Sequence, residues 1–201
     1  YSALAQRGYF PKEDLKTLRH TGSYLQGHPD MKHIPGVDMS SGSLGQGISA
    51  AVGMAIAAKL SGADYRVYTM LGDGEIQEGQ VWEASMLAAH KKLDNLVVIV
   101  DNNNLQIDGA IDEVNSPYPI DKKFEAFNFH VINIDGNDFD QIDAAFKEAR
   151  TVKGQPTAII AKTLKGKGVS YMEGQAGWHG KAPNDEEYKI AMEDLEKAGE
   201  A

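Results

Sequence analysis

The hydrophobic residues of this chain gather in short runs rich in β-branched side chains, and stretches with helical periodicity separate these runs. Two of the runs, at residues 68–71 and 98–100, each lead into a polar turn, as buried strands commonly do. Residues 77 to 93, between them, form a helical pattern rich in Ala, Glu, Met and Leu. Two strands joined through a helix are expected to lie side by side and parallel.

The same alternation continues along the chain. Residues 129–134 and 156–163 predict two further strands, with an amphipathic helix over residues 139–150 between them. Other helices are predicted over residues 44–60, with Ser43 as N-cap and Gly62 as stop, and after a capping box formed by Asn184 and Glu187. Residues 21–43 and 109–119 are expected to be loops. We therefore predict an α/β fold, a doubly wound and mostly parallel sheet with helices on both faces, in one domain over residues 1–201.

Polar turns follow the first two predicted strands. Gly72, Asp73 and Gly74 come after the first, and an Asn-rich turn comes after the second. Because parallel strands end at the same edge of a sheet, where such sheets bind ligands, the two turns are expected to adjoin. The glycines let a ligand approach the backbone, and a free helix N-terminus favours an anion. Asp73 would repel a phosphate there unless a divalent cation lay between them.

Magnesium is commonly bound by one or two carboxylates together with phosphate oxygens of a ligand. Asn103 can add a side-chain oxygen and Leu105 a backbone carbonyl. The predicted metal ligands are thus Asp73, Asn103 and Leu105, with two phosphate oxygens and a water. Two commoner phosphate-binding motifs are excluded, because a dinucleotide fingerprint needs glycine where Gln77 stands and the stretch lacks the Gly-Lys-Ser/Thr of a P-loop.

These residues resemble those of a known family. The Gly-Asp-Gly turn with Asn102-Asn103 is similar to the thiamine diphosphate motif of many enzymes. Further segments in the same order as in the transketolase family narrow the resemblance to that family. These segments are residues 75–79, 105–109, 27–30 and 42–47. The resemblance covers about residues 1–183. The resemblance implies thiamine diphosphate as cofactor, with Mg²⁺ (or Ca²⁺ or Mn²⁺) as its metal.

The resemblance also implies roles for single residues. The Gly42 carbonyl would accept from the cofactor's amino group, and Leu44 would pack against its rings. The full cofactor-binding set that it implies is Gly42, Ser43, Leu44, Gly72, Asp73, Gly74, Glu75, Asn103, Ile107 and His179.

Three residues would act in catalysis. His28 would hydrogen-bond a sugar hydroxyl, and His179 would contact the diphosphate near the substrate hydroxyls. Glu78 would join a network of acids and waters that connects two active sites. From the residues alone, His28 could instead be a turn histidine satisfied by backbone, and His179 a loop histidine packed under Trp178.

The composition of the chain limits the classes of partner that it could bind. A formal net charge of −9 argues against nucleic acid or an anionic membrane as partner, and an anionic ligand must be captured locally. The absence of cysteine excludes disulfides, thiolate zinc sites and a thiol nucleophile. No apolar run is long enough to span a membrane and no signal peptide opens the chain, so a cytoplasmic protein is expected.

The family has an upstream helical segment with a Lys-Gly-His motif, which is absent here, so an N-terminal segment is expected to be missing. The glutamate that activates the cofactor lies on another domain of the family, and no stretch here resembles its surroundings. Ser43 stands where single-chain transketolases usually carry proline. We therefore predict the N-terminal, diphosphate-binding subunit of a two-chain transketolase, with a C-terminal subunit carrying the pyrimidine-binding domain, assembled as a dimer of heterodimers.

The predicted reaction is transfer of a two-carbon ketol unit from a ketose phosphate to an aldose phosphate, as in the pentose phosphate pathway. Two alternatives stay open. Deoxyxylulose phosphate synthase or the alpha subunit of a 2-oxo acid dehydrogenase would share the Gly-Asp-Gly turn, although residues 27–30 and 77–79 speak against both. The other alternative is a non-catalytic remnant that binds only a partner, and the intact pair of Asp73 and Asn103 argues against it.

Overall fold

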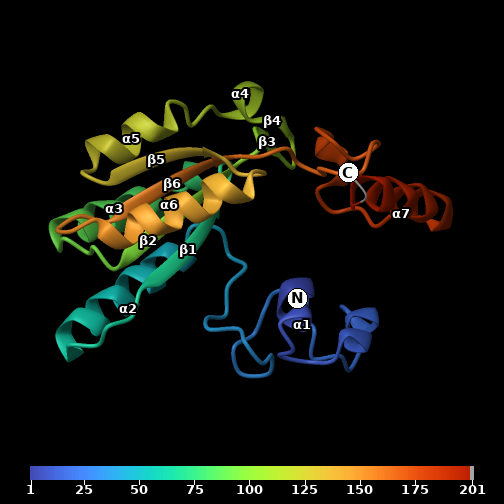
Figure 1. The fold of residues 1–201 in the computed structure, drawn as a ribbon, viewed down its shortest axis with the longest axis horizontal. Coiled ribbons are helices and arrows are strands. Elements are labelled where there is room, and N and C mark those ends of the chain that lie inside the picture. The colour runs from blue at the N-terminus through green and yellow to red at the C-terminus, as the bar shows by residue number, and fades with distance from the viewer. Residues whose placement is uncertain (200–201) are drawn as a thin grey trace. The chain divides into compact units, whose positions relative to one another are not determined.

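A computed structural model of the chain describes residues 1–199. The chain forms two compact units, the first over Tyr1–Gly47 and the second from Ile48 onward (Figure 1). The second unit contains the sheet. Among the described residues, no helix has both the length and the apolar character needed to cross a bilayer.

The sheet has four strands in the order β1-β2-β6-β5, and every neighbouring pair is parallel. The strands are β1 (Val67–Gly72), β2 (Leu96–Asn102), β6 (Thr157–Lys162) and β5 (His130–Asp135). In the register, Gly72 pairs with Asp101 and Asn102 pairs with Lys162. The predicted parallel pairing is therefore confirmed, and β1 and β2 end at the same edge of the sheet.

Helices cover both faces of this sheet (Figure 1). On one face, α2 (Gly47–Ser61), α3 (Gly79–His90) and α5 (Ile120–Ala126) pack in one core with Val98 of β2. On the other face, α6 (Phe139–Thr151) packs in a second core with Val97 of the same strand. Adjacent side chains of a strand point to opposite faces, so a strand buried on both sides needs a continuous apolar run. The doubly wound α/β prediction is confirmed.

The first unit consists mainly of loop. It contains α1 (Ser2–Gln6) and the short 3-10 helix η1 (Lys12–Thr17), and residues 21–43 form turns and bends as expected. A small core holds the unit together, made of Ala5, Phe10, Leu25 and Ile34.

The helix predicted over residues 44–60 begins later, at Gly47. A turn precedes it, in which the Gln46 N–H donates to the Ser43 carbonyl at 3.3 Å, so Ser43 is not the N-cap. The cause is Gly45, whose φ of +77° is not helical. At the other end Gly62 has φ +67° and stops the helix as predicted.

The stretch expected to be loop after residue 109 is also more ordered than predicted. A hairpin of β3 (Leu105–Gln106) and β4 (Gly109–Ala110) leads into α4 (Ile111–Val114). Fully buried Ile111 anchors this segment, and its N–H donates to the Asn104 carbonyl at 3.0 Å. Burial of one side chain thus orders a segment whose local pattern is too short to show periodicity.

Beyond β6, the chain contains the 3-10 turn η3 (Ala176–Trp178) and the helix α7 (Asp185–Gly199). The predicted capping box is confirmed at the start of α7. The Glu187 N–H donates to Asn184 Oδ1 at 2.9 Å, and the Asn184 N–H donates to Glu187 Oε2 at 2.8 Å.

The aromatic cluster between α3 and α5 gives a test of the core. Phe124 is fully buried, with its ring centroid 5.2 Å from Trp82 and 5.3 Å from Phe129. We expect Phe124→Ala to lower the free energy of unfolding by about 3–5 kcal/mol, because it leaves a cavity. Phe139→Ala is the matched control, since Phe139 is 87% exposed, and its effect is expected within about 0.5 kcal/mol. Urea denaturation measures both, and equal losses would contradict the assignment of this core.

Candidate functional site

The carboxylate of Asp73 lies at the junction of the two polar turns. The residue is 1% exposed, and its N–H donates to the Asp101 carbonyl at 3.1 Å, which extends the pairing of β1 with β2. Its Oδ1 accepts from the Gly74 N–H at 2.9 Å. Its Oδ2 accepts from the Asn104 N–H at 2.6 Å and from Asn102 Nδ2 at 3.1 Å. The predicted contact between the acid turn and the Asn-rich turn is therefore confirmed.

Burial raises the pKa of the Asp73 carboxyl, while the three N–H donors act in the opposite direction. A carboxylate has about four lone-pair positions, two on each oxygen. Oδ2 uses both of its positions on Asn102 and Asn104, whereas Oδ1 uses one on Gly74. One position thus stays open on Oδ1, in an environment that disfavours an uncompensated negative charge. A bound cation would suit both properties.

Asn103 and Leu105 lie in the Asn-rich turn on either side of Asn104, whose N–H donates to the Asp73 carboxylate. Asn103 Oδ1 accepts from the Leu105 N–H at 3.0 Å, which bends the chain into β3. A second lone pair of that amide oxygen, and the Leu105 carbonyl, are hard oxygen donors of the kind Mg²⁺ prefers. Within residues 1–199 no group of three or more His, Cys, Asp or Glu side chains could hold a metal, so a metal site here would rely on one acid and neutral oxygens.

The β3–β4 hairpin lies directly against the Gly-Asp-Gly turn. A Cβ at Gly74 would lie 3.1 Å from the Cβ of Gln106, which shows why glycine is favoured there. The Gln77 side-chain amide donates to Gln106 Oε1 and to the Asn115 carbonyl, each at 2.7 Å. Ile107, at the tip of the hairpin, is 70% exposed.

The remaining residues of the acid turn have local roles. Glu75 Oε2 accepts from the Gly72 N–H at 3.0 Å. Glu75 opens a 3-10 turn, η2 (Glu75–Gln77), so α3 begins two residues later than the pattern predicted. Glu78 is the exposed N-cap residue of α3, and its predicted role between two active sites stays a prediction.

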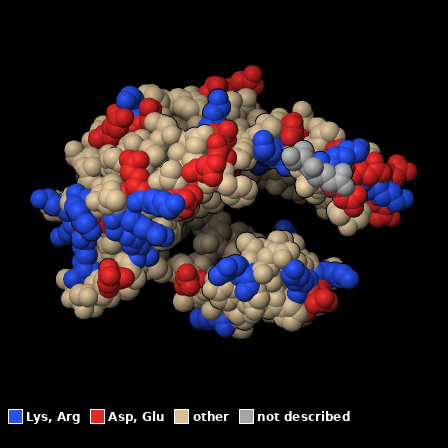
Figure 2. All heavy atoms as spheres, in the orientation of Figure 1, with Lys and Arg blue, Asp and Glu red and all other residues tan. Residues whose placement is uncertain are grey.

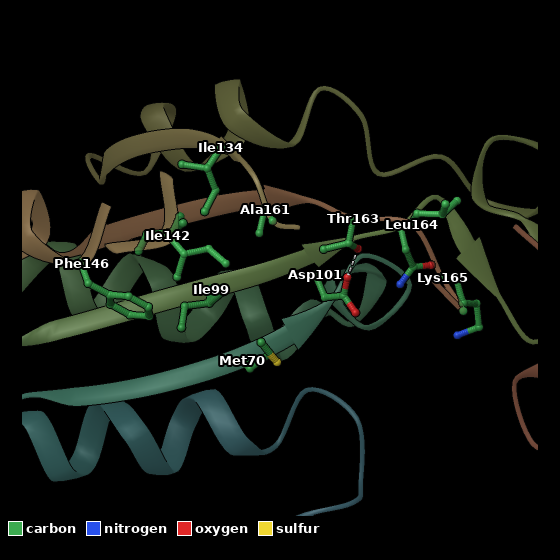
Figure 3. Close-up of a pocket in the computed structure, with 14 residues that line it drawn as sticks. Met70, Ile99, Asp101, Ile134, Ile142, Phe146, Ala161, Thr163, Leu164 and Lys165 are labelled. Carbon is green, nitrogen blue, oxygen red and sulfur yellow. Dashed lines mark hydrogen bonds between the residues drawn. The ribbon is translucent and has the colours of Figure 1, made fainter. Parts of the chain in front are cut away.

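A groove lies on the α6 face of the sheet, and the side chain of Asp101 points into it (Figure 3). Its volume is about 390 Å³, and Met70, Ile99 and Phe146 line its apolar part. Asp101 lines its polar end, where the Thr163 hydroxyl donates to Asp101 Oδ1 (Figure 3). The Asp101 side chain therefore points away from the contacts between the turns, in which Asp101 takes part only through its backbone carbonyl.

Basic side chains gather at the opposite edge of the sheet. Arg66 and Lys153 come just before β1 and β6, and Lys91 and Lys92 precede β2, so all four lie at the amino ends of strands. Figure 2 shows lysine and arginine concentrated at that end of the second unit. A phosphate at the carboxyl edge therefore has no help from this group of cations.

In the first unit the structure brings His28 and Gly42 into contact. A Cβ at Gly42 would lie 1.6 Å from His28 Nδ1, and Gly42 has φ +146°, so only glycine fits. A hollow of about 760 Å³ adjoins them, and Ser43 also lines it. Leu44, 60% exposed, follows in the turn before α2, where its predicted contact with the cofactor rings stays a prediction.

Asp30, for which no role was predicted from the sequence, shapes this loop. Its Oδ1 accepts from the Lys32 N–H at 3.0 Å and the Ser40 hydroxyl at 3.1 Å, and its Oδ2 contacts His33 Nδ1. These contacts lower the pKa of the Asp30 carboxyl, and the hydrogen bond from the Lys32 N–H has the largest effect. The position of Asp30 directly after Gly-His-Pro was the signal that could have identified it.

His179 lies in the C-terminal part of the second unit, in the loop that follows η3, and it is exposed. The Trp178 ring lies 5.0 Å from the Tyr171 ring, and Lys181 Nζ lies 4.0 Å from the Trp178 centroid. The exposure of His179 argues against the alternative in which it is packed under Trp178. Its role toward a cofactor stays a prediction.

A parallel α/β sheet whose first two strands end in an acid turn between glycines and an adjoining amide turn defines a cofactor-binding domain of the thiamine diphosphate class. The chain belongs to the transketolase family, since the family model described as "Transketolase, thiamine diphosphate binding domain" matches residues 1–197. Membership of this family disfavours the two other thiamine enzymes that the sequence left open.

Relatives with known names support the same assignment. The chain is 46% identical to the 6-deoxy-6-sulfo-D-fructose transketolase subunit of Clostridium sp. (strain MSTE9), over 99% of this chain and 72% of the relative. It is 43% identical to an apulose-4-phosphate transketolase subunit of Actinobacillus succinogenes, over 97% of this chain and 70% of that relative. The crystal structure of Campylobacter jejuni transketolase matches with a TM-score of 0.86 and 38% identity, over 92% of this chain and 30% of that one.

The contact between Gly42 and His28 can be tested without any ligand. We expect Gly42→Ala to displace the His28 imidazole and to cost about 1–3 kcal/mol, because the new methyl group overlaps the ring. Gly47→Ala is the control, since nothing lies within 4 Å of a Cβ built there. The His28 ring resonances in NMR spectra and urea denaturation measure the two effects. An unshifted His28 resonance in Gly42→Ala would show that the ring does not lie against Gly42.

Proposed function

We propose that this chain is the diphosphate- and metal-binding part of a two-chain transketolase, and that it binds thiamine diphosphate through a divalent cation. The observation that carries the proposal is the buried Asp73 carboxylate, held between two turns with one lone-pair position of Oδ1 open. When bound, the cofactor would supply the electron sink that the transfer of a ketol unit needs.

The metal site that we propose contains Asp73 Oδ1, Asn103 Oδ1 and the Leu105 carbonyl, with Mg²⁺ as the expected ion and Ca²⁺ or Mn²⁺ as substitutes. The chain carries a formal net charge of −9, so a diphosphate needs a local cation to approach Asp73. The ion would neutralise both groups and fix the diphosphate against the backbone of Gly72, Gly74 and Glu75.

Other residues would orient the cofactor and the substrate. The Gly42 carbonyl would accept from the amino group of the cofactor, with Ser43 and Leu44 beside it and Ile107 at the hairpin tip. His28 would hydrogen-bond a sugar hydroxyl, and its contact with Gly42 supports this pairing of roles. His179 is exposed and able to reach a ligand, and we propose that it contacts the diphosphate and substrate hydroxyls.

The relatives named as subunits support a two-chain enzyme. The matches span 97–99% of this chain and 70–72% of these relatives, whereas the match to mouse transketolase spans 90% of this chain and 29% of that protein. We propose that a companion subunit supplies the pyrimidine-binding domain and its activating glutamate, in a dimer of heterodimers in which Glu78 connects two sites. The lack of cysteine fits a cytoplasmic location.

The proposed reaction is ketol transfer from a ketose phosphate to an aldose phosphate. The names of two relatives specify different sugars, 6-deoxy-6-sulfo-D-fructose and apulose-4-phosphate, so the sugar is not set by membership of the family.

Removing the Asp73 carboxylate is the direct test of the metal site. We expect Asp73→Ala, in the full-length protein with its companion subunit, to abolish binding of thiamine diphosphate in the presence of Mg²⁺, because it removes the only charged protein ligand proposed. Asp143→Ala is the control, since Asp143 is an exposed residue of α6 that pairs with Lys147. Isothermal titration calorimetry measures both, and unchanged affinity in Asp73→Ala would refute the metal assignment.

The two-chain arrangement predicts a dependence on the companion subunit. We expect the full-length protein to show no ketol transfer by itself, because the proposal places the glutamate that activates the cofactor on the companion subunit, and to gain activity when the companion is added. A coupled assay with a ketose phosphate donor and an aldose phosphate acceptor measures this. Full activity of the single protein would refute the arrangement.

A further inference from the structure

The hydroxyl of Tyr118 contacts both asparagines that flank Asn103. Tyr118 lies in the segment between α4 and α5 and is 38% exposed. Its oxygen lies 2.6 Å from Asn102 Nδ2, and it donates to Asn104 Oδ1 at 3.3 Å. One hydroxyl from a distant part of the sequence therefore joins the side chains on either side of the amide proposed as a metal ligand.

The directions of these hydrogen bonds follow from the Asp73 carboxylate. Asn102 Nδ2 lies 3.1 Å from Asp73 Oδ2, and only the NH₂ group of the amide can donate to a carboxylate. One amide hydrogen of Asn102 then points to Asp73 and the other to Tyr118. Because the Tyr118 oxygen accepts from Asn102, its own hydrogen is available for Asn104 Oδ1.

Asn104 connects the hydroxyl to the same carboxylate through the backbone. Its N–H donates to Asp73 Oδ2 at 2.6 Å, and its φ of +64° lies in the left-handed region, which asparagine tolerates better than most residues. The bond from Tyr118 to the Asn104 side chain restrains the residue in this conformation. Tyr118 thus reaches Asp73 Oδ2 by two routes, through the Asn102 side chain and through the Asn104 backbone.

These two routes decide which oxygen of Asp73 is open. Asn102 and Asn104 together occupy the lone pairs of Oδ2, and this leaves the open position on Oδ1. If Asn102 turned away, Oδ2 would regain a free lone pair and the carboxylate could rotate. A cation that needs Asp73 Oδ1 and Asn103 at once depends on both groups keeping their orientation.

We propose that Tyr118 is a positioning residue of the metal site, and that its hydroxyl holds Asn102 and Asn104 so that Asp73 and Asn103 present their open oxygens to one cation. This inference rests on the proposed function, because the cation is part of that proposal. Tyr118 itself contacts neither the cation nor the cofactor in this role. Its effect is on the concentration of metal that the site requires.

The test compares Tyr118→Phe with Tyr65→Phe in the full-length protein with its companion subunit. Each substitution removes one hydroxyl, and the Tyr65 hydroxyl donates to the Met54 carbonyl at 3.2 Å, before the amino end of β1. Calorimetry measures thiamine diphosphate binding over a series of Mg²⁺ concentrations. We expect Tyr118→Phe to raise the half-saturating Mg²⁺ concentration about tenfold, as loss of two hydrogen bonds predicts. Tyr65→Phe is expected to change it less than about twofold.

Two further readouts separate positioning from loss of folding. In Tyr118→Phe, cofactor affinity is expected to return to the wild-type value at saturating Mg²⁺, with a melting temperature within a few degrees of the wild type. Asn102→Ala is expected to raise the Mg²⁺ requirement as well, and the double variant is expected to show less than the product of the two single effects, because both residues act on one carboxylate.

The outcomes distinguish the two proposals. If the wild-type protein shows no Mg²⁺-dependent cofactor binding, the proposed function is wrong and this inference falls with it. If the wild type binds and Tyr118→Phe has an unchanged Mg²⁺ requirement, the inference alone is wrong. Fully multiplicative effects of Tyr118→Phe and Asn102→Ala would also overturn it, because they would show that the hydroxyl acts independently of Asn102.

Discussion

The rest of the site depends on one buried carboxylate and the three N–H groups that hold it. A carboxylate that is 1% exposed loses most of its hydration, and burial raises the pKa of Asp73 despite its three donors. The donors come from Gly74, Asn102 and Asn104, so they also join the end of β1 to the end of β2. The acid is therefore both a structural junction and a negative charge that a cation between the two turns could use.

The charge distribution favours a cation beside Asp73 in the proposed function. The chain is acidic overall, and a group of lysines and arginines lies at the amino ends of the strands (Figure 2). A diphosphate beside Asp73 would meet backbone N–H groups and an acid that repels it, whereas Lys162, Lys165 and Lys167 lie at or after the end of β6. A divalent ion placed against Asp73 reverses the sign of the local field, in a way that distant surface cations cannot match in screened solution.

The sequence predicted the features that depend on repeating local patterns. Continuous apolar runs predicted parallel strands buried on both faces, and the structure has Val97 and Val98 in different cores. The start of α2 was missed because the non-helical conformation of Gly45 delays the first turn of the helix, which a pattern of small apolar residues does not show. The segment at Ile111 was missed because burial of one residue orders it.

The same distinction holds at the site. Adjacent parallel strands predicted that Asp73 would meet the Asn-rich turn, and the hydrogen bonds confirm it. Tyr118 could not be found in this way, because it lies 16 residues from Asn102 in the sequence and a lone tyrosine before a proline has no periodic signal.

The pleat of β2 also limits how this protein can vary. Asp101 points into the groove on the α6 face, whereas the next residue, Asn102, reaches Asp73. Inserting or deleting one residue between Val100 and Asn104 would exchange these two directions and turn the amide away from the acid. At the hairpin tip and between β6 and α7, a change of one residue would not reverse the directions of Asp101 and Asn102. Length differences among homologues are therefore compatible with the contact to Asp73 at these two places, but not at the end of β2.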